Sequence, residues 1–350
     1  MIAVVSCGAL VALGEPVTIS LLRRAAALDV PNGRSSHTVP TPRGGGAPIA
    51  VGLVLVALLI RSPAAIAFAI AVAAFGAIGF ADDLTGLPVS RRLLLQGLGS
   101  VAAAIALVSN LVLPPVALAA AAAVIAMWIV GFVNAFNFMD GVNGISGVHA
   151  ALGGAAYACL GVWRPHLFLV AGGGALAAGA LAFLPWNAVR ARVFLGDVGS
   201  YGLGAALGVL AACAVIGGIP VEAAVGPLAL YLADTAWTLQ RRIRSGERFF
   251  EAHRTHTYQR WCDVGWTHQE VTLITAAITI LISLLGAVSL AGNLDLRLAA
   301  DLAALAVLAV YLGSPALLGR LDLSPHVRHD LLPDAHAGHF LAPELQRERG

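Results

Sequence analysis

Long apolar runs are the feature that most limits what this chain can fold into. A helix needs about 20 apolar residues to cross a hydrocarbon core of roughly 30 Å, and the sequence contains many runs of that size. Charged residues make up 11% of the 350 residues, whereas soluble domains carry about a quarter. The composition therefore excludes an ordinary soluble domain and predicts an all-α, polytopic membrane protein.

Charged residues, prolines and glycines divide these runs into about eleven predicted transmembrane helices. The predicted spans cover residues 2–22, 47–60, 64–81, 93–109, 115–133, 146–162, 166–184, 201–218, 221–239, 270–291 and 298–318. We assign residues 1–320 to one membrane domain and residues 321–350 to a C-terminal tail. The loops on one side of the predicted bundle are short, and those on the other side are longer and more polar.

The arginines predict the orientation of these spans. All 21 strongly basic residues are arginines, because the chain has no lysine. If the N-terminus lies outside, 18 of them fall in the inner segments and the tail, and only Arg61, Arg164 and Arg297 fall outside. Cytoplasmic loops are enriched in basic residues. The bias predicts an N-out, C-in topology with the longer loops and the tail in the cytoplasm.

Most residues capable of chemistry lie at these inner loops. A transporter usually places its ionisable groups near the midplane of the membrane, and here only Glu15 and Asp234 are expected there. Asp234 lies deepest in an apolar run, so it most needs a partner. The distribution favours a membrane enzyme with a site at the cytoplasmic face over a transporter.

The first inner loop ends in the run Thr41-Pro-Arg43-Gly44-Gly45-Gly46. Its prolines and glycines exclude a helix. Arg43 would place a guanidinium beside backbone amides that approach a ligand closely, a combination that suits phosphate oxygens. The alternative is a basic, flexible connector that only satisfies the charge bias of the loops.

Two adjacent acids, Asp82 and Asp83, end the third predicted span. Carboxylates at a helix C-terminus oppose the helix dipole, and an acid at the membrane boundary is costly unless it binds something. Neighbouring side chains on a helix diverge by about 100°, so we expect the two acids to have different partners. One could meet a metal or act as a base while the other orients a partner; the alternative is a solvated helix end.

Further oxygen and amide groups follow the fifth and precede the eighth predicted span. Asn134, Asn137 and Asp140 recur every three residues, so they share one stripe if the helix continues that far. Such groups can bind a nucleobase or ribose, or complete a metal shell. Asp197, flanked by glycines at a helix start, is our first choice for a direct Mg²⁺ ligand. Ser200 is expected to be a helix N-cap.

The last inner loop is the most basic and contains His253-Arg254-Thr-His256. Histidine with arginine suits a diphosphate better than zinc, because no third soft ligand lies near; a solvated basic loop is the alternative. Oxygen ligands without thiolates point to Mg²⁺, with Mn²⁺ as the second choice. Mg²⁺ together with arginines points to phosphoryl-type transfer, here between a soluble anionic donor and a lipid acceptor.

Five motifs occur in order between about Leu22 and Gln259. They are Ser36-His37-Thr-Val-Pro-Thr-Pro-Arg-Gly-Gly-Gly, Asp82-Asp83, Asn134-Ala-Phe-Asn137-Phe-Met-Asp140-Gly141, Phe194-Leu-Gly-Asp197-Val-Gly-Ser200 and His253-Arg-Thr-His256. With them the chain resembles the bacterial polyprenyl-phosphate N-acetylhexosamine-1-phosphate transferases of glycosyltransferase family 4. The last motif lacks the consecutive histidines of the phospho-N-acetylmuramoyl-pentapeptide transferases and is more similar to the branch that initiates O-antigen and related surface polysaccharides.

The resemblance implies transfer of an N-acetylhexosamine-1-phosphate from its UDP form to undecaprenyl phosphate, with release of UMP. The sugar would be GlcNAc or a 6-deoxy sugar such as FucNAc or QuiNAc. Mg²⁺ would be required, and the enzyme would lie in the bacterial inner membrane with its site facing the cytoplasm. The peptidoglycan transferase remains the alternative within the family. No nucleic-acid partner is expected, and a homodimer is left open.

The resemblance also assigns roles to residues. It implies catalytic roles for Asp82, Asp83, Asp140 and Asp197. It implies metal binding by Asp197, Asn134 and Asp140. It implies substrate binding by His37, Thr41, Arg43, Asn134, Asn137, His253, Arg254 and His256. The family mechanism is either direct attack by the lipid phosphate or a covalent aspartyl intermediate; direct attack needs only positioning and charge neutralisation, and we favour it.

Overall fold

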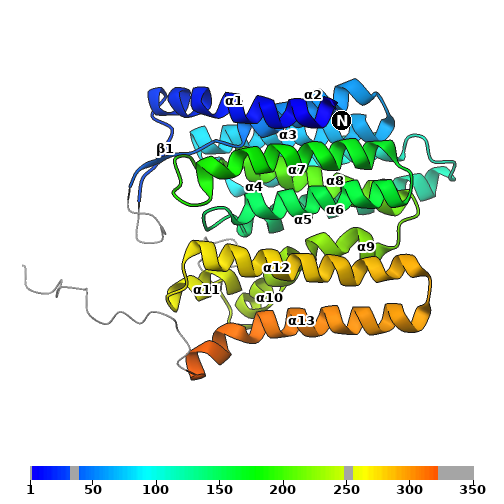
Figure 1. Ribbon diagram of the computed structural model, residues 1–350. Helices are drawn as coiled ribbons and strands as arrows, with labels where there is room; N and C mark the ends of the chain where they lie inside the picture. The colour runs from blue at the N-terminus through cyan, green and yellow to red at the C-terminus, as the bar shows by residue number, and fades with distance from the viewer. Residues whose placement is uncertain (1, 32–38, 248–254, 322–350) are drawn as a thin grey trace, which may run out of the picture.

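The computed structural model describes residues 2–31, 39–247 and 255–321, and these ranges are almost entirely helical (Figure 1). The elements are α1 (Ile2–Arg24), β1 (Leu28–Asp29), β2 (Thr41–Pro42), α2 (Ala47–Ile60), α3 (Pro63–Thr85), α4 (Val89–Val108), α5 (Pro115–Phe138), α6 (Ile145–Trp163), α7 (Leu167–Asn187), α8 (Gly196–Ile216), α9 (Val221–Val225), the 3₁₀ turn η1 (Gly226–Leu228), α10 (Ala229–Arg244), α11 (Thr257–Asp263), α12 (His268–Ala287), the 3₁₀ turn η2 (Val288–Ala291) and α13 (Leu294–Leu321). The predicted all-α, polytopic class is confirmed.

Nine helices within the described ranges are long and apolar enough to cross a membrane. Two predicted spans are not among them. The second, α2, has 14 residues. The ninth, predicted as one helix over 221–239, is divided into α9, η1 and α10 at Gly226-Pro227. Proline has no backbone N–H and clashes with the preceding turn, so the chain changes direction there instead of continuing straight.

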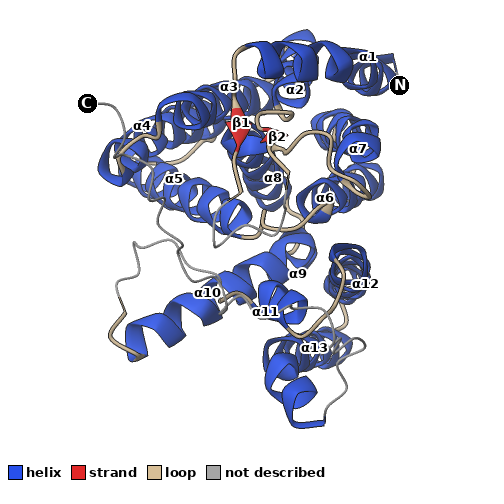
Figure 2. Cartoon of the chain, turned by 90° about the vertical axis from the view of Figure 1, so that its left-hand side faces the viewer, coloured by secondary structure: helices blue, strands red, loops and turns tan. Residues whose placement is uncertain are grey.

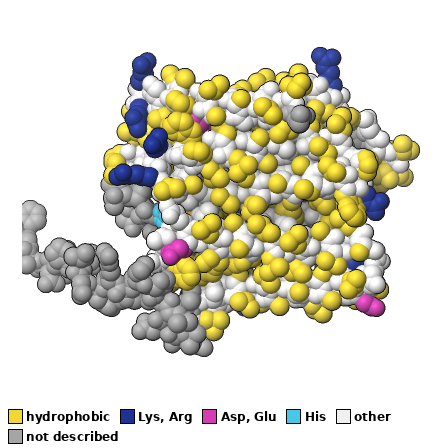
Figure 3. Space-filling model, viewed as in Figure 1, with side chains coloured by type: hydrophobic (Ala, Val, Ile, Leu, Met, Phe, Trp, Pro, Cys, Tyr) yellow, Lys and Arg dark blue, Asp and Glu magenta, His cyan; other side chains and the backbone are white. Residues whose placement is uncertain are grey.

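The long helices lie side by side and alternate in direction, so their connections fall at two opposite ends of the bundle (Figure 1). We call the end at which α3 and α5 finish and α8 begins the site end. The polar inner loops predicted from the sequence lie at this end. On the face seen in Figure 3, apolar side chains cover the flank of the bundle and dark-blue basic side chains gather mainly at the same end.

The helices form two groups, α1–α8 and α9–α13 (Figure 2). Within the first group α8 is the central helix: 89% of its most apolar 18-residue window is buried, whereas the corresponding value for α13 is 11%. A helix surrounded by others has no lipid-facing side, so α8 can carry polar groups at its buried N-terminus if neighbouring helices supply partners.

Glycine allows α3 and α2 to approach the start of α8. A Cβ atom added to Gly79 of α3 would overlap the backbone of Asp197, and one added to Gly46 would overlap the backbone of Gly199. Small residues permit such close helix approach in membranes. This packing brings the end of α3 and the loop before α2 to the first turn of α8, where the polar motifs meet.

Candidate active site

The glycine run before α2 lies beside the segment that leads into α8. The N–H groups of Gly44 and Gly45 donate to the carbonyl oxygen of Phe194, at 3.2 and 2.9 Å, and the N–H of Gly46 donates to that of Leu195 at 2.9 Å. The prediction that these amides are available to phosphate oxygens was wrong, because they are used within the protein. The run instead fixes the preceding Arg43 beside α8.

Asp83, at the end of α3, binds the N-terminus of α8. Its carboxylate accepts hydrogen bonds from the N–H groups of Asp197, at 2.9 Å, and Val198, at 3.0 Å. The first amides of a helix lack partners within the helix and carry its positive dipole end. Asp83 therefore caps α8 from another helix, and its side chain is only 3% exposed.

Arg43 joins two carboxylates that lie 114 residues apart in the sequence. Its Nε lies 2.8 Å from Oδ1 of Asp83, and its Nη2 lies 2.9 Å from Oδ2 of Asp197. Burial alone would lower the pKa of Arg43, but the charges of Asp197 and Asp83 outweigh it and raise the pKa. The side chain is still 38% exposed, so the guanidinium can reach an anionic ligand from outside.

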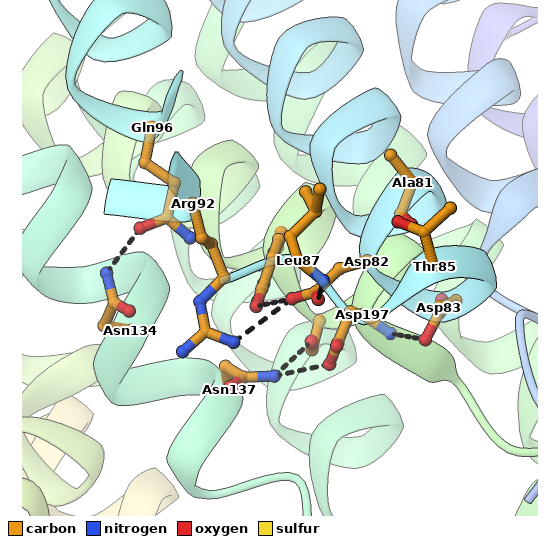
Figure 4. A network of polar contacts seen from close by, with 12 residues as sticks. Ala81, Asp82, Asp83, Thr85, Leu87, Arg92, Gln96, Asn134, Asn137 and Asp197 are labelled. Atoms are coloured by element: carbon orange, nitrogen blue, oxygen red, sulfur yellow. Dashed lines mark hydrogen bonds and ion pairs between the residues drawn. The ribbon is translucent and has the colours of Figure 1, made fainter. Parts of the chain in front are cut away.

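Asn137, in the last turn of α5, completes this arrangement. Its side-chain N–H₂ donates to Oδ1 of Asp197 at 3.0 Å and to the Ser200 hydroxyl oxygen at 2.9 Å (Figure 4). Ser200 is a buried residue of the first turns of α8 and not its N-cap, which is Leu195; that prediction was wrong. Four predicted motifs thus meet within hydrogen-bonding distance at the start of α8.

Asp140 follows in the turn after α5. The helix ends at Phe138, so Asp140 does not continue the helical stripe of Asn134 and Asn137. Burial raises the pKa of the Asp140 carboxyl to about 7, and the charge of Asp197 contributes to this rise. A carboxyl perturbed in this way, close to further acids, is typical of sites that bind a cation or perform chemistry.

Asp82 has partners of its own, as its divergence from Asp83 predicts. Its Oδ2 accepts from Arg92 Nη1 at 3.1 Å and from the Tyr201 hydroxyl at 2.9 Å, and its Oδ1 accepts from the N–H of Leu87 at 2.8 Å (Figure 4). Sequence reasoning missed Arg92 and Tyr201 as site residues. The only signal was the basic pair at the start of α4, which we had used for orientation alone.

Asn134 points to α4 and not to the Asp197 group. Its side-chain N–H₂ donates to Gln96 Oε1 at 2.9 Å and to the carbonyl oxygen of Val130 at 2.8 Å (Figure 4). Gln96 is fully buried and was not predicted as a site residue. Asn134 and Asn137 therefore contact different helices although they share one face of α5.

The remaining predicted residues are dispersed. Thr41 is buried in β2, and its hydroxyl donates to the Val39 carbonyl oxygen at 3.0 Å. His256 is 2% exposed, and its Nδ1 lies 3.2 Å from Oδ1 of Asp234, which supplies the partner that Asp234 was expected to need. The last three predicted substrate-binding residues lie outside the described residues: His37, His253 and Arg254.

Comparisons with known proteins relate this chain to a family of transferases. The model of glycosyl transferase family 4 matches residues 65–215, a range that contains both acids of α3, the asparagines of α5 and the start of α8. The chain is 29% identical over 306 residues to a decaprenyl-phosphate N-acetylglucosaminephosphotransferase of Mycobacterium tuberculosis, a match that covers 73% of each chain.

Two further relatives cover similar shares. A probable undecaprenyl-phosphate N-acetylglucosaminyl 1-phosphate transferase of Bacillus subtilis is 25% identical, over 77% of this chain and 79% of the relative. A phospho-N-acetylmuramoyl-pentapeptide-transferase of Phenylobacterium zucineum is 28% identical, over 71% and 79%. The family model and these relatives together support the resemblance of the chain to glycosyl transferase family 4.

Proposed function

We propose that this protein transfers an N-acetylhexosamine-1-phosphate from a UDP-sugar to undecaprenyl phosphate, forming the lipid diphosphate sugar and UMP. The observation that carries the proposal is the bridge formed by Arg43 between Asp83 and Asp197, with Asn137 on the second carboxylate. It unites carboxylates, a carboxamide and a partly exposed guanidinium at the end of a membrane bundle. Relatives named for transfer of N-acetylglucosamine phosphate to a polyprenyl phosphate support it.

Mg²⁺ fits the donor groups of this site, and Mn²⁺ would fit the same donors. Asp83, Asp197 and Asp140 are close enough for their charges to interact, and Arg43 also lies among them, so added positive charge would be favourable. In the described part of the chain, no three His, Cys, Asp or Glu residues form a group ready to hold a metal. We propose that Asp197 and Asp140 hold Mg²⁺, with the side chain of Asn137 beside Asp197; Asn134, which points to α4, is not part of this set. The ion would neutralise the diphosphate of the donor.

The mechanism that we propose is direct attack. An oxygen of the lipid phosphate attacks the phosphorus that bears the sugar, a new P–O bond forms, and the bond to the oxygen bridging the two phosphorus atoms breaks, so UMP leaves with that oxygen. Asp83 holds the start of α8, and Asp82 holds Arg92 and the N–H of Leu87, so we assign both acids positioning roles. Asp82 with Arg92 would position the lipid phosphate, and Arg43 would bind the donor phosphates.

The site end would face the cytoplasm of a bacterium, in its inner membrane. The arginine bias supports this sidedness, because Arg61, Arg164 and Arg297 are the only arginines predicted on the other side. UDP-sugars would then reach Arg43 from the cytoplasm, and the lipid acceptor would approach from within the bilayer. The product would initiate O-antigen or a related surface polysaccharide.

A panel of donors tests the proposal. Purified protein with undecaprenyl phosphate and Mg²⁺ is given UDP-GlcNAc, UDP-linked 6-deoxy-N-acetylhexosamines and UDP-N-acetylmuramoyl-pentapeptide, and released UMP is measured. We expect UMP from an N-acetylhexosamine donor. Release from the pentapeptide donor alone would instead favour phospho-N-acetylmuramoyl-pentapeptide transfer, the activity for which the Phenylobacterium relative is named. No UMP from any donor would overturn the transferase proposal.

A further inference from the structure

Another buried acid lies away from the start of α8, in the group formed by α9–α13. Asp234 of α10 is 0% exposed and was not assigned a role by the sequence motifs. A carboxylate taken out of water is costly unless hydrogen-bond donors replace the water. The contacts of Asp234 therefore show what the protein holds in place with it.

Donors from three helices surround this carboxylate. Its Oδ1 accepts from the N–H of Thr257 at 3.1 Å and the hydroxyl of Thr238 at 3.2 Å, and it lies 3.2 Å from Nδ1 of His256. Its Oδ2 accepts from the Tyr311 hydroxyl of α13 at 2.6 Å. A carboxylate only accepts hydrogen bonds, so Nδ1 of His256 carries the proton in this contact. Asp234 thereby fixes the ring orientation and the first turn of α11.

The first turn of α11 also packs against the turn that contains Asp140. The Tyr258 hydroxyl donates to the carbonyl oxygen of Phe138 at 3.0 Å, and a Cβ atom on Gly141 would overlap the oxygen of Tyr258. The rings of Phe138 and His256 are 6.1 Å apart. The short helix α11 thus connects Asp234 with the part of the site that follows α5.

We propose that Asp234 is a positioning residue that holds His256 beside the Asp140 turn for binding of the UDP-sugar, with Tyr311 of the last helix fixing Asp234 in turn. The proposal rests on the proposed transferase function. It makes α13, of which only 11% of the most apolar window is buried within the protein, a support of the site for the soluble substrate. If the contacts of Asp234 only stabilised the fold, their loss would change the KM for both substrates, and the change would not depend on His256.

Substitution of Asp234 separates these roles. In Asp234→Asn we expect KM for the UDP-sugar to rise about tenfold, the size that loss of a hydrogen bond to a charged group allows, while KM for undecaprenyl phosphate stays within about twofold. In a His256→Ala background, Asp234→Asn should add less than about twofold. Equal changes in both KM values, or an undiminished effect without His256, would overturn the proposal.

Matched variants keep the test independent of folding. Thr235→Val alters the neighbouring residue of α10, whose hydroxyl has no hydrogen-bond partner among the described residues, and should leave both KM values unchanged. Tyr311→Phe removes only the hydroxyl that contacts Asp234, and it replaces Asp234→Asn if that variant does not fold. We expect it to raise the same KM by about threefold; no change in KM would count against the proposal.

Hydrogen–deuterium exchange gives a readout that needs no activity. In Asp234→Asn the amides of residues 255–264 should exchange faster, and those at the start of α8 should not. Unchanged exchange in 255–264 would overturn the positioning role even in an active enzyme. Faster exchange there in a protein that releases no UMP would instead locate the failure in the proposed function.

Discussion

Asp83 and Asp234 each hold the N-terminus of another helix, but their surroundings differ in exposure. Each is a buried carboxylate that accepts hydrogen bonds from the backbone at the start of another helix: two N–H groups of α8 for Asp83 and one of α11 for Asp234. Asp83 also binds Arg43, which is 38% exposed and continues to Asp197. The partners of Asp234 are all buried or nearly so. One region is open to a charged ligand, and the other is closed around its acid.

The two regions are also packed differently. Near Asp83, the backbones of neighbouring segments are in contact, because Gly79 and Gly46 have no Cβ atom; a Cβ at either position would overlap the backbone of α8. Around Asp234, side chains such as Tyr311 fill the space and supply the hydrogen bonds. Close backbone contact gives a rigid frame for Asp197, whereas side-chain contacts set the orientation of His256. Substitutions should therefore affect catalysis most in the first region.

The largest effect is expected from Asp197→Ala. Asp197 receives both Arg43 and Asn137 and is our proposed metal ligand, so its loss should lower the rate of UMP release about a thousandfold. Asp301→Asn on α13, far from the start of α8, is the control and should retain wild-type activity. Undiminished UMP release by Asp197→Ala would contradict the claim that the open region around Asp197 is the catalytic one.

Arg43→Lys should have the next largest effect. Lysine presents a point charge and cannot reproduce the planar fork that bonds Asp83 through Nε and Asp197 through Nη2. We expect kcat/KM for the UDP-sugar to fall about a hundredfold, the equivalent of two hydrogen bonds to charged groups. Steady-state kinetics measures it. An active Arg43→Lys enzyme would show that charge alone suffices and that the bridge has no catalytic importance.

Gly79→Ala tests the close packing of α3 on α8. Because the added Cβ would overlap the backbone of Asp197, α3 must shift, at a cost of about 1–3 kcal/mol. We expect a lower midpoint of thermal unfolding in detergent and about tenfold lower activity. Gly97→Ala on α4 is the matched control, since a Cβ there meets no atom of the described part of the chain within 4 Å. Equal behaviour of the two variants would contradict this account of the packing.

The smallest effect is expected from Gln96→Ala. Gln96 accepts one hydrogen bond from Asn134, which keeps a second bond to Val130. Loss of a neutral hydrogen bond costs about 1 kcal/mol, so activity should fall by no more than about fivefold. A loss as large as that of Asp197→Ala would mean that Asn134 belongs to the centre of the site, as the sequence motif implies.

Sequence patterns predicted the long helices and the meeting of the main polar residues. Both predictions depend on local information. The helices were predicted from the length of apolar runs, and the meeting of Arg43, Asp83, Asn137 and Asp197 from their positions at or near predicted helix ends. The break of the ninth span had a local signal too, Pro227, which the hydropathy of 221–239 outweighed in our prediction. Apolar length alone does not distinguish one straight helix from two short ones.

The partners of individual side chains could not be predicted. Asp82 binds Tyr201, and Asp234 binds Tyr311, each across more than 70 positions of sequence. Such pairs depend on the rotation and contact of packed helices, which a single sequence does not specify. The role of the glycines at 44–46 could not be predicted for a similar reason. Glycine is typical both of loops that bind ligands and of close contacts between backbones, and the sequence does not distinguish the two.

The most direct test of the proposed transfer follows the phosphorus that bears the sugar. A UDP-N-acetylhexosamine that supports UMP release is labelled at its β-phosphorus and incubated with protein, Mg²⁺ and undecaprenyl phosphate. We predict that the label enters the lipid extract in an amount equal to unlabelled UMP, and that Asp197→Ala produces neither. Label that stays in the aqueous phase as sugar phosphate or inorganic phosphate would contradict transfer to the lipid carrier.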